Sequence, residues 1–156
     1  MIENNMQTFI DAIVNYFSQM SDKKVVVGSP YLLDEKSMTI SDYTGVITIS
    51  GAYEGCCYFT APRILLRYII MALGEPDTSE EMLLDTVGEV ANTLSGNARR
   101  DLGREFIISV PAVYKNRSDV QTLPGDGRTY AIPIVCSSYK ALLGIRLSQS
   151  NIKAAA

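Results

Sequence analysis

One long segment with helical periodicity, from Ser79 to Gly103, constrains the fold more than any other feature of the chain. Projected at roughly 100° per residue, its apolar side chains gather on one face. That face comprises Leu83, Val87, Val90, Leu94 and Ala98, with Leu84, Ala91 and Leu102 beside it. Thr78 or Ser79 can cap its start, because both side chains accept hydrogen bonds from free backbone N–H groups. The pattern predicts one helix over Ser79–Gly103 that packs on a core.

The rest of the chain contains two further helical patterns and several short runs of β-forming residues. Apolar residues spaced by three, four and seven predict a helix over Met6–Met20, and Pro62 opens another that runs to Gly74. Strands are predicted at Val25–Val27, Gly45–Gly51, Cys56–Thr60, Phe106–Val113, Tyr130–Cys136 (broken by Pro133) and Ala141–Leu147, with a turn at Ala52–Gly55. Because strands follow one another with few intervening helices, we predict an α+β fold, a largely antiparallel β-sheet with long helices packed against it. No internal repeat is evident.

Length and composition set limits on the class of protein. The 156 residues suit a single domain over 1–156, with an ordered core at about 6–148 and a tail at 149–156. A formal net charge of −3 argues against nucleic acid as the main partner. No apolar run approaches the roughly 18 residues of a membrane helix, so we expect no membrane contact and a soluble, cytoplasmic protein. Three cysteines, Cys56, Cys57 and Cys136, are expected to be buried thiols.

The chain has no histidine, which removes imidazole bases, Ser-His-Asp catalysis and every zinc site that contains histidine. Any chemistry must therefore use carboxylates, amides, amines, hydroxyls or thiols, or groups that a partner supplies.

The polar face of the long helix carries the candidate chemistry. Opposite the apolar stripe lie Asp85, Glu89, Asn92, Gly96, Arg99 and Gly103. A solvent-facing polar surface is the ordinary explanation for such a stripe. Asparagine and glycine are, however, poor helix formers, and each glycine costs about 1 kcal/mol relative to alanine. The glycines would leave a groove through which another backbone could approach.

Glu89 and Asn92 are three residues apart, so their head groups project to the same side of the helix. An amide is too weak a base to take a proton, but it can hold a water molecule in a fixed orientation. A carboxylate can bind a lysine or arginine through a charge-assisted hydrogen bond. Phosphoryl transfer suits such a pair, because its catalysis consists mostly of positioning and charge stabilisation.

The run from Asp85 to Ala98, followed by Ser109-Val-Pro111-Ala-Val113, resembles the CheC/CheX/FliY family of chemotaxis phosphatases, and its CheX branch in particular. The family pattern places an acidic residue or serine, then Glu, then Asn, then a later Pro. Asp85, Glu89, Asn92 and Pro111 occupy these positions. The similarity extends to other segments: Phe9-Ile10, Gly28-Ser29-Pro30-Tyr31, Gly45–Gly51, Gly55 and Met71-Ala-Leu-Gly74-Glu75.

This resemblance implies a phosphatase that hydrolyses the aspartyl phosphate of a CheY-type response-regulator receiver domain. It implies that Asn92 orients the attacking water and that Glu89 pairs with the receiver's lysine. Asp85, Gly96 and Arg99 are candidate partner-binding residues. Asp85 could equally pair with a neighbouring residue of the helix, and Arg99 could simply complement the helix dipole. The resemblance also implies that Mg²⁺ belongs to the receiver, that this chain binds no cofactor, and that the protein is a homodimer in two-component signalling.

Two alternatives stay open at this point. The chain could be a non-catalytic protein that binds a receiver, since the same stripe would serve docking. It could also be a flagellar-switch scaffold protein, which the length of 156 residues counts against.

Overall fold

The computed structural model describes residues 2–20, 25–34, 39–120 and 122–149. Its elements are α1 (Ile2–Ser18), β1 (Val25–Val27), β2 (Tyr31–Leu32), β3 (Tyr43–Gly51), β4 (Tyr53–Ala61), α2 (Arg63–Ala72), α3 (Glu80–Leu102), β5 (Phe106–Ile108), β6 (Ala112–Lys115), η1 (Arg117–Asp119), β7 (Tyr130–Cys136) and β8 (Tyr139–Gln149). The fold is therefore α+β, as predicted. β8 runs one residue into the segment expected to be a tail, and 150–156 lie outside the described residues.

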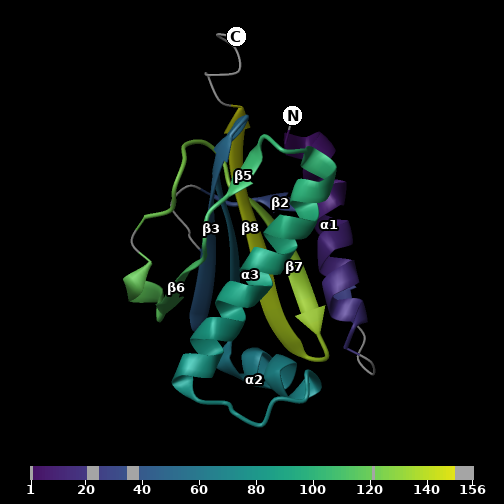
Figure 1. Cartoon of the computed structure of the whole chain (residues 1–156), viewed down its shortest axis with the longest axis vertical. Coiled ribbons are helices and arrows are strands. Elements are labelled where there is room, and N and C mark those ends of the chain that lie inside the picture. The colour runs from purple at the N-terminus through teal and green to yellow at the C-terminus, as the bar shows by residue number, and fades with distance from the viewer. Residues whose placement is uncertain (1, 21–24, 35–38, 121, 150–156) are drawn as a thin grey trace.

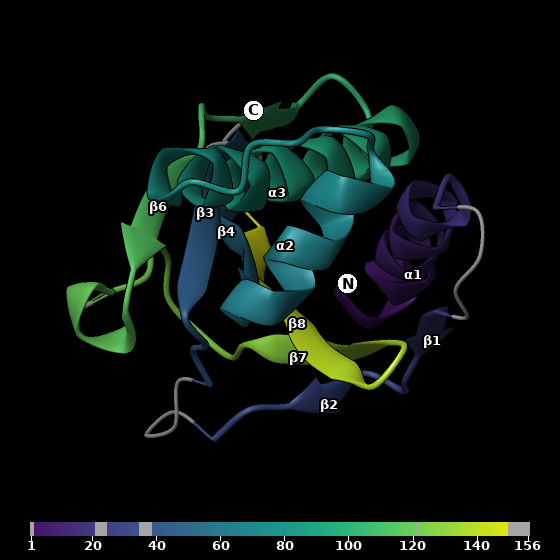
Figure 2. The same cartoon turned by 90° about the horizontal axis from the view of Figure 1, so that it is seen from below.

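The eight strands form one sheet in which every described pairing is antiparallel. The main order is β1-β7-β8-β4-β3-β5, with β2 paired to β7 and β6 paired to β3. Figure 1 shows α1 and α3 lying antiparallel to one another across the sheet, with α2 at its lower end. Seen from below, all three helices lie on one face, so the outer side of α3 is turned away from the sheet (Figure 2).

The topology contains an internal two-fold repeat that the sequence did not reveal. Each half is a helix followed by four strands, α1 with β1–β4 and α3 with β5–β8, and α2 connects the halves. The repeat relates β1 to β5, β3 to β7 and β4 to β8. When each strand is replaced by its equivalent in the other half, the order β1-β7-β8-β4-β3-β5 reads in reverse, and the β2–β7 pairing becomes the β6–β3 pairing. The sequence shows no repeat because equivalent elements share their place in the topology but not their residues.

Helix α3 begins and ends where the sequence predicts. The Ser79 side chain accepts a hydrogen bond from the backbone N–H of Met82 at 3.3 Å, which caps the start. Gly103 ends the helix with a φ of +99°, a conformation that favours glycine. The glycine at 103 is thus explained by the cap and not by the polar stripe.

Two other glycines set how closely α3 approaches the sheet. A Cβ placed on Gly45 of β3 would lie 2.6 Å from the carbonyl oxygen of Val87, and one on Gly88 of α3 would lie 2.7 Å from a methyl carbon of Val113. Both positions therefore need glycine for this packing distance. The close approach fixes the height and rotation of α3, and with them the direction of its polar stripe.

Three local predictions about strands needed correction. The turn expected at Ala52–Gly55 is shorter, because β4 starts at Tyr53 and Gly55 pairs with both Ile49 and Leu147 inside the sheet. Pro133 does not break β7. Its backbone N and carbonyl oxygen face the side where β1 ends and β2 has not begun, and the carbonyl accepts a hydrogen bond from the Gly28 N–H there. The missing N–H of the proline therefore leaves no gap in the hydrogen bonds between β7 and β8.

The third correction concerns the strand expected at Phe106–Val113. It is two strands, β5 and β6, separated by Ser109–Pro111, and both pair with β3. Ser109 bridges the interruption, because its N–H donates to the Thr48 carbonyl and its hydroxyl accepts from the Thr48 N–H.

The core lies between the sheet and the three helices, with a smaller apolar cluster on the other face. Alternating residues of β4 serve the two sides: Cys57 belongs to the main core and Cys56 to the cluster that the β6–β7 connection covers. All three cysteines are buried free thiols, as predicted, and burial raises the pKa of Cys56 to about 12.

Candidate functional site

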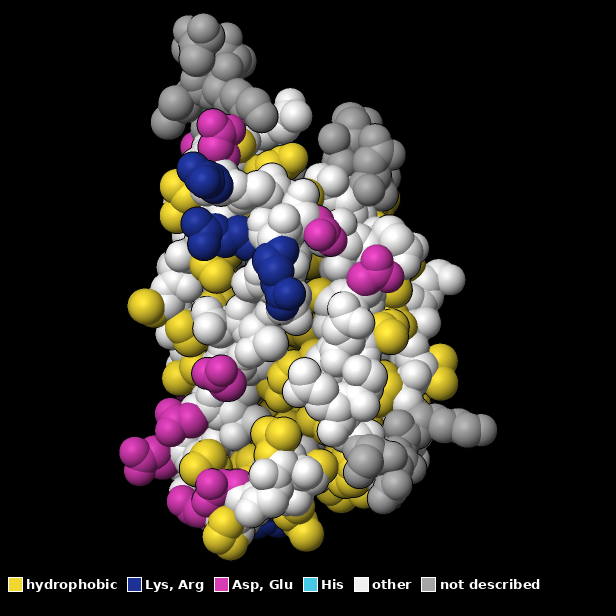
Figure 3. Space-filling model, turned by 45° about the vertical axis from the view of Figure 1, so that its right-hand side comes forward, with side chains coloured by type: hydrophobic (Ala, Val, Ile, Leu, Met, Phe, Trp, Pro, Cys, Tyr) yellow, Lys and Arg dark blue, Asp and Glu magenta, His cyan; other side chains and the backbone are white. Residues whose placement is uncertain are grey.

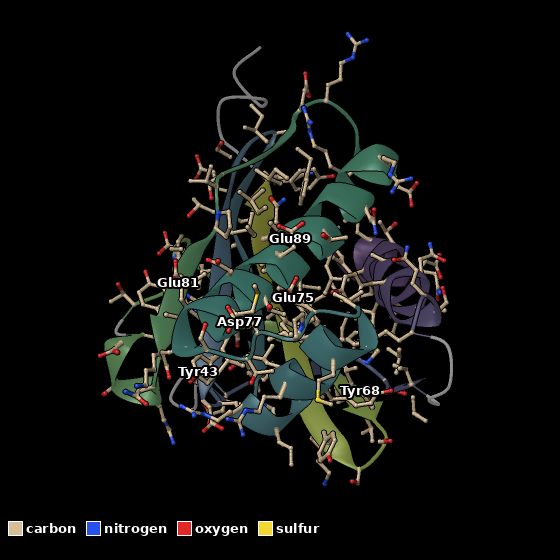
Figure 4. The ribbon with its side chains drawn as sticks, turned by 60° about the horizontal axis from the view of Figure 1, so that its bottom comes forward. Tyr43, Tyr68, Glu75, Asp77, Glu81 and Glu89 are labelled. Carbon is tan, nitrogen blue, oxygen red and sulfur yellow. The ribbon has the colours of Figure 1, made fainter. Side chains whose placement is uncertain are left out.

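The outer face of α3 presents the acid–amide pair. Glu89 is exposed and Asn92 is partly exposed, whereas their neighbours Val90 and Ala91 are fully buried. Figure 4 shows Glu89 on the side of α3 that faces away from the sheet. Across the part of the chain that the structure describes, neither head group has a hydrogen bond or salt bridge. Because positions i and i+3 of a helix are roughly 5–6 Å apart at Cβ, both head groups can reach one partner group.

Helix α1 borders this pair on one side. A polar groove of about 530 Å³ runs between α1 and α3, lined by Thr8, Asp11, Ala12, Asn15, Tyr16, Gln19, Thr93, Asn97, Arg100 and Asp101. Burial in this groove, with the Glu89 carboxylate nearby, raises the pKa of Tyr16 to about 12. Tyr16 therefore stays neutral at physiological pH and adds no negative charge beside Glu89.

On the opposite side of α3, the β5–β6 segment lies close to the helix. Pro111 carbon atoms lie 3.4 and 3.5 Å from where a Cβ on Gly88 would be, which makes Gly88 the contact point. Pro111 thus holds the strand path beside the helix. The next residue back, Val110, is 86% exposed, so the segment presents an apolar side chain at the edge of the stripe.

The three predicted partner-binding residues lie along the same helix but in different settings. Asp85 is exposed, one helical turn before Glu89. Gly96 is partly exposed, and nothing lies within 4 Å of where its Cβ would be. Arg99 is exposed beyond it. The space above Gly96 is therefore open, and its use by a partner's backbone stays a prediction.

Gly96 and Arg99 contribute to a shallow basin of about 300 Å³ at the C-terminal end of α3. Its lining consists of Gly96, Arg99, Arg100, Gly103 and Arg104. Arg104 follows the helix and was missed from the sequence, because its place beside Arg99 depends on the turn at Gly103. We call this hollow the arginine basin.

The N-terminal end of α3 is anchored by an ionic network. The Tyr43 hydroxyl donates to Glu80 at 2.6 Å, and Arg63 binds both groups, at 2.8 Å to Tyr43 and 3.1 Å to Glu80. Lys115 of β6 completes the network at 3.4 Å from Glu80. The hydrogen bond from Tyr43, followed by the charges of Lys115 and Arg63, lowers the pKa of Glu80. Residues of β3, α2 and β6 thereby hold the helix that carries the stripe.

No described cluster of three or more histidine, cysteine or acidic residues could hold a metal ion. Among the described helices, none is both long enough and apolar enough to cross a membrane.

Comparisons with known proteins agree with this architecture. The sequence profile of the family described as chemotaxis phosphatase CheX matches residues 43–135. A chemotaxis protein CheX from Desulfovibrio desulfuricans has a similar structure, with a TM-score of 0.79, 23% identity, and coverage of 93% of this chain and 99% of that one. A chemotactic CheC-like protein from Shewanella oneidensis also gives 0.79, at 23% identity over 95% of this chain and 100% of the other.

A third similar structure is the CheX of a CheX–CheY–BeF3–Mg²⁺ complex from Borrelia burgdorferi. Its TM-score is 0.75 at 20% identity, and the match covers 92% of this chain and 97% of that one. These structural similarities show the shared fold. A search of the curated proteins found no match to the sequence. The matched profile spans β3 to β7 and includes all of α3 with its polar stripe. The chain therefore belongs to the chemotaxis phosphatase CheX family.

Proposed function

We propose that this chain hydrolyses the aspartyl phosphate of a CheY-type receiver domain, with Asn92 and Glu89 as the residues that enter the receiver's site. The proposal is supported by the family, by the similarity to a protein crystallised with CheY, BeF3 and Mg²⁺, and by the exposed pair on α3. The observation that carries the proposal is that neither head group forms a hydrogen bond or salt bridge with another described residue. Both side chains project from a helix that is held at its start and along its length.

In the proposed reaction, a water molecule attacks the phosphorus atom while the bond from phosphorus to the aspartate oxygen breaks. The products are the receiver's free carboxylate and inorganic phosphate. The Asn92 amide would hold this water through its carbonyl oxygen, in line with the bond that breaks. Mg²⁺, which we propose is held by the receiver's own carboxylates, would neutralise part of the charge that develops on the phosphoryl oxygens.

Glu89 has a different part in this proposal. Its carboxylate would bind the receiver's active-site lysine through a charge-assisted hydrogen bond, which fixes the orientation of the two proteins. Glu89 would thus contribute mainly to binding, and Asn92 mainly to the chemical step.

The test is a dephosphorylation assay. It uses a panel of phosphorylated receivers, because the sequence of this chain does not specify which receiver is its partner. We expect Asn92→Ala to lower kcat on the order of 100-fold, the scale of losing one preorganised polar group. Glu89→Gln should instead raise KM about tenfold, which corresponds to about 1.4 kcal/mol.

A matched control separates catalysis from folding. Alanine forms helices better than asparagine, so Asn92→Ala should leave α3 as stable as before or slightly more so. Asn97→Ala makes the same change about one and a half turns further along the helix, at a partly exposed position whose amide accepts from Arg100. It should keep kcat within about twofold of the wild type. An Asn92→Ala variant that turns over as fast as the wild type would refute the mechanism, and stoichiometric binding without turnover would favour the non-catalytic alternative.

A further inference from the structure

The charges on the outer side of α3 are separated along its length. The first half carries Glu81, Asp85 and Glu89, whereas Glu80 is paired with Arg63 and Lys115. The far end carries Arg99 and Arg100, with Arg104 just beyond. Figure 3 shows Lys and Arg side chains gathered on the upper part of this face, with a few Asp and Glu side chains near them, and a larger group of Asp and Glu side chains at its lower left. The stripe is therefore polarised, although the whole chain carries a net charge of −3.

The arginine basin has no acidic residue in its lining among the described residues. Every charged residue that lines it is an arginine, and Arg99 and Arg104 have no salt bridge to a carboxylate in the described ranges. Arg100 donates to the Asn97 amide and lines both the basin and the groove between α1 and α3, where Asp11 also lies. Asp101 faces the groove between α1 and α3 rather than the basin. Three exposed guanidinium groups around an open hollow are arranged to receive negative charge from outside.

The basin lies close enough to Asn92 for a protein bound at Asn92 to cover it as well. With a rise of about 1.5 Å per residue, Gly96 is about 6 Å and Arg99 about 10 Å along the helix from Asn92. A phosphoryl group carries roughly −1.5 to −2 charges at neutral pH, and Mg²⁺ sites are built from carboxylates. A receiver whose active-site mouth lies over Asn92 would therefore bring anionic groups near the basin.

We infer that the arginine basin is an electrostatic docking site for the acidic rim of the phosphorylated receiver's active site, and that with Glu89 it sets the orientation in which the receiver docks. The inference rests on the proposed function and extends it to the partner's surface. The receiver's lysine side faces Glu89 and its acidic side faces Arg99, Arg100 and Arg104. A receiver turned by 180° would oppose like charges at both ends of the stripe, which disfavours that orientation.

The test measures association rates, so it does not depend on turnover. A CheY receiver loaded with beryllofluoride and Mg²⁺ is mixed in stopped flow with the wild type, with R99Q/R100Q/R104Q, and with the control R117Q/R128Q/K140Q. The control removes the same charge at exposed positions outside α3 and the turn that follows it. Thermal unfolding of each variant reports on the fold.

We expect the wild-type association rate to fall about tenfold as the salt concentration rises from roughly 0.02 to 0.5 M, because screening shortens the range of the attraction. The basin variant should be about tenfold slower than the wild type at low salt and should equal it at high salt. The control should stay within about twofold of the wild type throughout. A wild-type rate that rises with salt, or a basin variant no slower than the control, would overturn the inference.

The same experiment separates this inference from the proposed function. Asn92→Ala should keep the salt-dependent association and lose phosphate release from a phosphorylated receiver. A wild type that associates in a salt-dependent way but releases no phosphate refutes the proposed function and supports the docking site. A wild type that releases phosphate with a salt-independent association rate does the reverse, and a chain that binds no receiver overturns both.

Discussion

Gly96→Ala tests the idea that one glycine in α3 serves a partner rather than the fold. Glycine inside a helix costs about 0.5–1 kcal/mol relative to alanine. No atom lies within 4 Å of where the new Cβ would be, so no packing penalty offsets this gain. We expect the free energy of unfolding to rise by about 0.5–1 kcal/mol, and the Tm by about 1–4 °C in a chain of this size.

The same residue is proposed to admit the receiver's backbone, so the variant should bind more weakly while it folds better. A methyl group in this groove should raise KM for the phosphorylated receiver about tenfold, or about 1.4 kcal/mol, with kcat little changed. Urea unfolding gives the stability, and the dephosphorylation assay gives KM and kcat. A variant that is more stable and equally active would show that the open space at Gly96 has no part in docking.

Gly88→Ala is the matched control on the same helix. The helix gains the same propensity, but the new Cβ would lie 2.7 Å from a methyl carbon of Val113 and 3.4 Å from Pro111. Overpacking of this kind costs about 1–3 kcal/mol, so we expect a net loss of about 1 kcal/mol. The free energy of unfolding should therefore rise in Gly96→Ala and fall in Gly88→Ala. A Gly88→Ala variant that is more stable than the wild type would refute the close packing that orients the stripe.

Three further predictions concern the frame that holds the stripe. Ser79→Ala should lower the free energy of unfolding by about 1 kcal/mol in urea titrations, because the N–H of Met82 loses its acceptor; an exposed Ser138→Ala should change nothing. The pKa of Glu80 is lower in the folded state than its ordinary 4.5, so this group stabilises the fold above that pH and the benefit disappears as pH falls through the lowered value. Glu80→Gln should therefore flatten the acid side of a Tm-against-pH curve, and an unchanged curve would contradict the network around Tyr43. The expected homodimer stays a prediction: sedimentation velocity at micromolar concentration should show a dimer, and a monomer would reject it.

The local features of α3 could be predicted from the sequence because they depend on neighbours within the helix. The capping serine at 79, the glycine that ends the helix at 103 and the apolar stripe are all consequences of helical geometry. The common orientation of Glu89 and Asn92 is of the same kind, since a spacing of three residues places them on one face wherever the helix packs. The short strand β1 over Val25–Val27 likewise followed from β-forming residues in a row.

Predictions failed where a residue's role depends on strands that are distant in sequence. Gly55 has the composition of a turn, but its place between β3 and β8 makes it a strand residue. Pro133 is tolerated because the strands beside it are interrupted at that point, which no local pattern reveals. The split at Ser109–Pro111 likewise follows from contacts with Thr48 and with α3.

By itself, the sequence determined that a long amphipathic helix would carry an acid, an amide and a glycine on one exposed face, because side chains three and four residues apart are neighbours on any α-helix. Only the tertiary structure decided that Gly45 and Gly88 let this helix lie close to the sheet, that Tyr16 lies beside Glu89, and that Arg104 joins Arg99 around a basin. These relations join groups from separate elements, and their positions are set by packing and by chain turns rather than by spacing along the sequence.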